Sequence, residues 1–106
     1  MSIEKKNDIS FLFVISGRNQ SDTLVAFLTA LDAGIVNVSY GRGSVKPTSP
    51  LVEIFGFVPE EDKVIITCLL SRKKAHEALD KLEQKFNFNK SNTGIAFSAD
   101  VDRLSF

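Results

Sequence analysis

The sequence has 106 residues, the length of one ordinary domain, and its 13 basic and 13 acidic side chains cancel. A balanced charge provides no long-range field toward phosphates, so nucleic acid is not an expected partner. The single cysteine excludes an internal disulfide and a multi-thiolate metal site. No apolar run approaches the ~20 residues of a membrane span. These features predict one soluble, cytoplasmic domain over residues 1–106.

The first 40 residues show strand, helix and strand patterns in turn. Residues 9–16, ISFLFVIS, are β-branched or aromatic almost throughout, which is typical of a strand buried on both faces. Ser21 offers an oxygen for a helix N-cap, and apolar residues then recur at helical spacing up to Gly34. Gly34 is expected to close this helix in a left-handed conformation. Residues 35–40, IVNVSY, predict a second strand.

The second half of the chain contains another strand and another helix. Residues 63–70, KVIITCLL, indicate a buried strand, and 51–57 could pair with it as a hairpin arm. Ser71 is expected to cap a helix with one apolar face. That face consists of Ala75, Ala78, Leu79, Leu82 and Phe86.

The polar segment 87–94 is expected to end this helix by fraying, and 95–101 alternates as a half-buried strand. Leu104 and Phe106 could add a short edge. The order βαββαβ predicts an α+β, ferredoxin-like sandwich, an antiparallel sheet with two helices on one face.

The uncovered face of this sheet is apolar and therefore needs a partner. A second copy of the chain is the simplest partner, so we expect a homo-oligomer. RNA binding on such a face requires exposed aromatic residues flanked by cations. Phe11 and Phe13 instead stand among apolar neighbours, which favours a subunit interface.

Few residues suggest catalysis or metal binding. The only histidine, His76, lies among lysines on the second predicted helix and is expected to be solvated. Cys68 has apolar neighbours and no cation that would lower its pKa, so we expect a buried structural cysteine. The acidic residues 60–62 lie in one turn and do not form a facing pair. The chain is therefore not expected to be an enzyme.

Residues 41–50, GRGSVKPTSP, are rich in glycine, proline and cations and predict an exposed loop. The run Tyr40-Gly41-Arg42-Gly43 at its start offers backbone N–H groups and a guanidinium that suit phosphate or carboxylate. A second glycine turn, around Gly94, could approach the same edge of the sheet. An anion-binding pocket is one interpretation, and a turn with a solvated arginine is the other.

Three short motifs resemble those of the PII superfamily of signal-transduction proteins, over residues 9–104. Residues 39–42, SYGR, resemble the aromatic-Gly-Arg motif at the base of the family's T-loop. Residues 57–59, FVP, resemble the step before its third strand, and 93–97, TGIAF, resemble its B-loop. Ile95 stands where nitrogen regulators of this family have a phosphate-binding lysine, so the resemblance is to a divergent member.

The resemblance implies a regulatory, non-catalytic homotrimer with its sheets facing inward and a core formed by 8–40 and 63–104. Small anionic effectors, with ATP, ADP or AMP as candidates, would bind in clefts between subunits, and no obligatory cofactor or metal is implied. The implied ligand-binding residues are Tyr40, Gly41, Arg42, Gly43, Thr93, Gly94 and Ile95.

The same resemblance identifies residues 41–57 as the T-loop, which would dock onto a target protein. The targets that it implies are membrane transporters and metabolic enzymes, often in nitrogen regulation. The implied partner-binding residues are Ser44, Lys46, Thr48 and Ser49.

Two other functions are compatible with the same topology. A structural or metal-tolerance trimer of CutA type would lack nucleotide sensing, although one histidine and one buried cysteine make a poor metal site. A small acyl-phosphate hydrolase could use Arg18, which follows the first strand, but the glycine-rich phosphate cradle expected beside that strand is missing.

Overall fold

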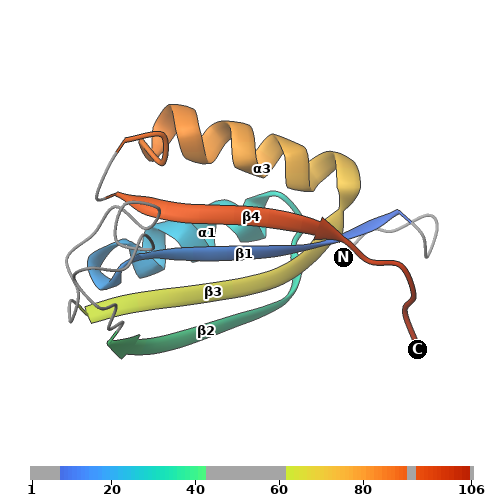
Figure 1. Ribbon diagram of the computed structural model, residues 1–106, viewed down its shortest axis with the longest axis horizontal. Helices are drawn as coiled ribbons and strands as arrows, with labels where there is room; N and C mark the ends of the chain where they lie inside the picture. The colour runs from blue at the N-terminus through green and yellow to red at the C-terminus, as the bar shows by residue number, and fades with distance from the viewer. Residues whose placement is uncertain (1–7, 43–61, 91–92, 106) are drawn as a thin grey trace, which may run out of the picture.

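The structure is a computed structural model that describes residues 8–42, 62–90 and 93–105. Two helices cover one face of a four-stranded antiparallel sheet (Figure 1). The sheet order β2-β3-β1-β4 and the two helices confirm the predicted α+β, ferredoxin-like fold. The strands are β1 (Ile9–Gly17), β2 (Gly34–Arg42), β3 (Asp62–Ser71) and β4 (Gly94–Asp100), and the helices are α1 (Ser21–Ala30) and α3 (Arg72–Lys85).

The core lies between the helices and one face of the sheet. Alternate residues of β1 and β3 point toward the helices, since successive side chains of a strand point to opposite faces. Their burial is the main source of stability in a domain of this size. The core side chains are Leu12, Val14, Val64, Ile66, Cys68 and Leu70 of the sheet and Leu24, Leu28, Leu31, Ala75, Ala78 and Leu82 of the helical layer.

The ends of α1 differ from the prediction. Its N-cap is Gln20, which makes no side-chain capping hydrogen bond, and the Ser21 hydroxyl instead lies 3.1 Å from the Tyr40 hydroxyl. After the helix, Asp32 takes the left-handed φ of 63° that was expected at Gly34. Aspartate tolerates this conformation better than most residues, so the chain leaves the helix early and Gly34 opens β2.

The start of α3 is as predicted and its end is not. The Ser71 hydroxyl accepts a hydrogen bond from the Lys74 backbone N–H at 3.2 Å, which confirms the N-cap. The expected fraying is wrong, because Asn87 takes a left-handed φ of 60° and the Phe88 N–H donates to the Leu82 carbonyl at 3.0 Å. Phe88 then packs against the core, although it stands in a polar stretch of sequence.

The C-terminal segment adds no strand to the sheet within residues 101–105. The Val101 N–H donates to the Ile9 carbonyl at 2.9 Å, and Leu104 belongs to no strand. Three predictions lie outside the described residues: the strand position of Phe106, the hairpin arm 51–57 and the exposed loop over residues 43–50. Among the helices that the structure describes, none is both long and apolar enough to cross a membrane.

The Ser71 cap leads to a first prediction. Replacing Ser71 with alanine removes the oxygen that accepts the Lys74 N–H, so the variant should lose about 1 kcal/mol of unfolding free energy in urea denaturation. The exposed Ser105→Ala change is the matched control and should leave the midpoint unchanged. Equal midpoints for both variants would contradict the capping role.

Candidate functional site

One end of the sheet carries the predicted anion-binding residues of β2. Residues 40–42 end this strand at the base of the 43–61 segment and pair with 62–64 of β3. At this end Lys63 is only 4% exposed, and its partners on the two neighbouring strands are both glycines, Gly17 and Gly41. Lys63 was not predicted as a site residue, because in the sequence it is only the first residue of an apolar strand. Its position between two glycines depends on the strand register.

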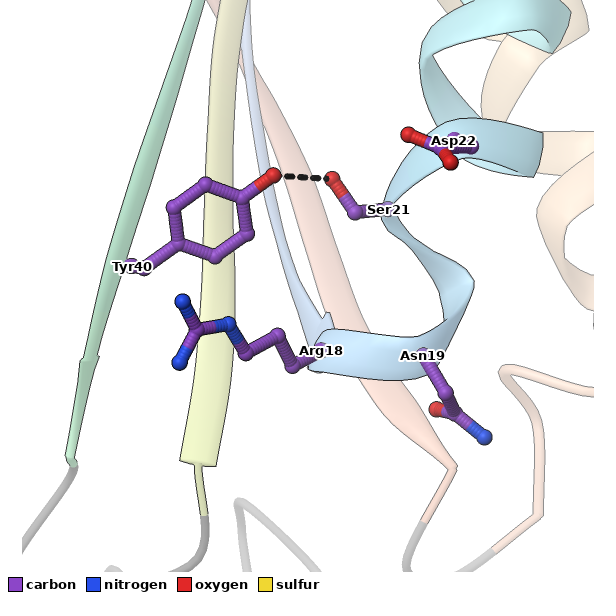
Figure 2. A pocket seen from close by; sticks show the side chains of 5 residues that line it. All are labelled: Arg18, Asn19, Ser21, Asp22 and Tyr40. Carbon is purple, nitrogen blue, oxygen red and sulfur yellow. Dashed lines mark hydrogen bonds between the residues drawn. The ribbon is translucent and has the colours of Figure 1, made fainter.

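Tyr40 is held from two sides by the connection between β1 and α1 (Figure 2). The Arg18 guanidinium carbon lies 4.4 Å from the centre of the Tyr40 ring, a cation–π contact. The Tyr40 hydroxyl lies 3.1 Å from the Ser21 hydroxyl, and Ser21 is buried. Since Tyr40 pairs with the core residue Val64, its ring lies on the helix-facing side of the sheet. The aromatic residue at the base of the predicted loop is thus fixed to the start of α1.

A shallow hollow of about 390 Å³ opens beside this contact. Arg18 comes from the 3₁₀ turn η1 (Arg18–Gln20), and the other lining side chains come from the same turn, the start of α1 and the end of β2. The polar run 18–22 between a buried strand and a helix was a signal for such a site. Its meeting with β2 could not be read from the sequence alone. The lining residues are Arg18, Asn19, Ser21, Asp22 and Tyr40.

The other half of the predicted site lies at the opposite edge of the sheet. β2 and β4 are the two edge strands, with β3 and β1 between them (Figure 1). Residues 93–95 therefore share one end of the sheet with 40–42 but lie three strand spacings away, roughly 14 Å. The expectation that both turns gather at one edge is wrong for a single chain.

Gly94 is required by packing. A Cβ added there would lie 2.6 Å from the Phe88 ring and 3.0 Å from the Ile15 carbonyl oxygen, so no larger residue fits without a shift. The Ser16 hydroxyl donates to the Thr93 carbonyl at 3.4 Å and fixes the same turn. The glycine therefore has a structural reason that does not depend on a bound phosphate.

Cys68 and His76 have the burial that was expected of each. Cys68 is buried, and burial raises the pKa of its thiol to about 11, so the thiol stays protonated and unreactive at neutral pH. His76 is exposed on α3. The described residues contain no group of three or more His, Cys, Asp or Glu side chains that could hold a metal ion.

The packing of Gly94 gives a second prediction. Gly94→Ala should lower the free energy of unfolding by about 1–3 kcal/mol, because the added methyl group overlaps the Phe88 ring. The matched test repeats the substitution in a Phe88→Leu background, where the smaller side chain should reduce the loss. Urea denaturation of the four proteins measures this coupling. The same loss in both backgrounds would show that Phe88 is not the obstacle.

Searches with the whole chain found no matching family model and no matching curated protein. Solved structures, however, share its fold. A candidate PII-like signalling protein from Thermus thermophilus is 18% identical, with a TM-score of 0.64 over 88% of this chain and 86% of its own. CPII from Thiomonas intermedia K12, solved with ADP, AMP and acetate, is 13% identical, with a TM-score of 0.65 over 88% and 85% of the two chains.

A DUF3240 family protein from Shewanella baltica is 10% identical, with a TM-score of 0.65 over 93% of this chain and 96% of its own. All three matches extend over most of both chains, although the sequences have diverged widely. The architecture that the resemblance implied is thereby confirmed: this chain has the fold of PII-like signalling proteins.

Proposed function

We propose that this protein is a divergent PII-like regulatory protein that binds a small anionic effector and catalyses no reaction. One observation carries the proposal. Two cationic residues, Arg42 and Lys63, occupy neighbouring positions of paired strands at the end of the sheet where β2 leads into residues 43–61. Guanidinium groups and backbone N–H groups of glycine-containing turns are suited to phosphate and carboxylate.

The proposed effector is an adenine nucleotide. The structure of CPII, which shares this fold, was solved with ADP and AMP. ATP, ADP and AMP all carry the phosphate that the cationic end of the sheet would attract. In this proposal Tyr40, Gly41, Arg42 and Gly43 contact the effector from one side, and residues 93–95 contact it from the other.

The two halves would meet across an interface between copies of the chain. The face of the sheet opposite the helices carries Phe13 and Phe97, whose rings stack with centres 4.9 Å apart, and Phe97 is 49% exposed. Ile65, Leu69 and Ile95 lie half-buried on the same face. A homotrimer with these faces inward would cover them and would bring the β2 end of one subunit near the β4 start of the next.

In this proposal, effector binding is signalled to a target protein through residues 41–57. These residues follow the effector-binding end of β2 directly, so an effector at residues 40–43 would act on their base. The target would be the cytoplasmic side of a membrane transporter, or a metabolic enzyme in the cytoplasm. The partner-contacting residues would be Ser44, Lys46, Thr48 and Ser49.

A binding measurement tests the effector. Isothermal titration with AMP, ADP and ATP should show binding of at least one nucleotide to the natural protein. Arg42→Glu should weaken that binding by roughly tenfold or more, since it replaces a charge-assisted donor with a repelling carboxylate. The exposed Arg103→Glu change has the same charge difference and should leave the affinity unchanged. Absence of binding by all three nucleotides, or equal affinities for both variants, would contradict the proposed site.

A second experiment tests the interface. Phe97→Glu places a charge on the uncovered sheet face and should shift the protein toward monomer in size-exclusion chromatography with light scattering. Ala26→Glu introduces the same charge at an exposed position of α1 and should leave the mass unchanged. Circular dichroism checks that both variants are folded. A natural protein that is monomeric, or a Phe97 variant that assembles normally, would argue against association through this face.

A further inference from the structure

The hollow beside Tyr40 is lined by one positive and one negative side chain. Arg18 reaches it from η1 and Asp22 from the first turn of α1 (Figure 2). Both are exposed, and among the described residues neither forms an ion pair. A surface whose opposite charges stand apart, with a hollow beside them, is complementary to a ligand that carries both charges itself.

Arg18 is arranged for a carboxylate. Its guanidinium carbon lies 4.4 Å from the centre of the Tyr40 ring, and this cation–π contact limits where the group can move. The guanidinium N–H donors form a fork that matches the two oxygens of a carboxylate. The contact with Tyr40 means that the group loses less conformational freedom on binding than an arginine that is free in solvent.

The hydroxyl pair adds a donor at the same place. Ser21 and Tyr40 share one hydrogen bond of 3.1 Å, in which either oxygen can donate. Each hydroxyl carries one proton, so the pair uses one proton internally and retains the other. The retained proton can be donated to a ligand oxygen. Ser21 is buried, so its oxygen is fixed in position by the packing of α1.

We propose that this hollow binds a small zwitterion of the α-amino acid class. Arg18 and the retained hydroxyl proton hold the carboxylate, and Asp22 accepts from the ammonium group. The hollow is open, and its volume of about 390 Å³ leaves room for a small ligand. Asp22 selects against ligands with several negative charges, because these would place a like charge beside it. The site lies on the helix-facing side of β2, away from the sheet face proposed as the interface, and its existence does not depend on nucleotide binding.

Tyr40 belongs both to this hollow and to the base of the proposed loop. A ligand that engages Arg18 and the hydroxyl pair changes the two contacts that fix Tyr40 to the start of α1. An amino acid would then act on the same loop base as the nucleotide.

The test is calorimetric titration of the full chain with each standard amino acid, with acetate and methylammonium as the two half-ligands. At least one amino acid should bind roughly tenfold or more tightly than either half-ligand, since only the whole zwitterion makes both charged contacts. Failure of every amino acid to bind, or binding no tighter than acetate, would overturn the proposal.

Two variants identify the site. Arg18→Gln and Asp22→Asn should each weaken amino acid binding by roughly tenfold, whereas the exposed α3 changes Lys73→Gln and Asp80→Asn should not. Asp22→Asn should retain acetate binding. Equal losses in the α3 controls would overturn the assignment to this hollow. ADP titration separates the two proposals: Asp22→Asn should keep the ADP affinity of the natural protein while losing amino acid binding, and a natural protein that binds the amino acid but not ADP would contradict only the nucleotide site.

Discussion

The antiparallel pairing of β1 with β3 is the contact on which the rest of the structure depends. These two apolar strands form the centre of the sheet, and their register assigns alternate side chains either to the helix-covered core or to the uncovered face. It also makes β2 and β4 the edge strands. The same register sets Gly17 opposite Lys63 and so brings the turn after β1 to the end of the sheet where β2 leaves it. The geometry of the candidate site follows from this one pairing.

Local contacts fix the side chains at that end of the sheet. The Arg18 cation–π contact and the Ser21 hydroxyl contact both converge on Tyr40, so the end of β2 is linked to the start of α1. At the opposite edge, Phe88 closes over Gly94 and leaves no room for a side chain there. The two halves of the proposed effector site are thus built differently: a polar aromatic contact in one and close apolar packing in the other. Their separation within one chain is the physical reason why the proposed function requires an assembly.

Much of the fold could be predicted from the sequence, because its strongest signals are local. Residues 9–16 and 63–70 are apolar over a full strand length, and Ser71 precedes a helix with a clear apolar face. The errors arose where a tertiary contact overrides local preference. Ser21 is placed to cap α1, yet its hydroxyl faces Tyr40 instead. Phe88 stands in a polar segment, yet Gly94 leaves a space that its ring fills.

The site was less predictable than the fold for the same reason. Tyr40 and the glycines stand out in the sequence, but only the strand order shows that Lys63 and the polar turn 18–22 lie near them.

The most direct test of the central claim, an effector site completed between subunits, is native mass spectrometry of the full chain with and without ADP. The account predicts a trimer that takes up one ADP per chain, with no nucleotide on any residual monomer. A monomer throughout, or a monomer that binds ADP as well as the assembly does, would contradict it.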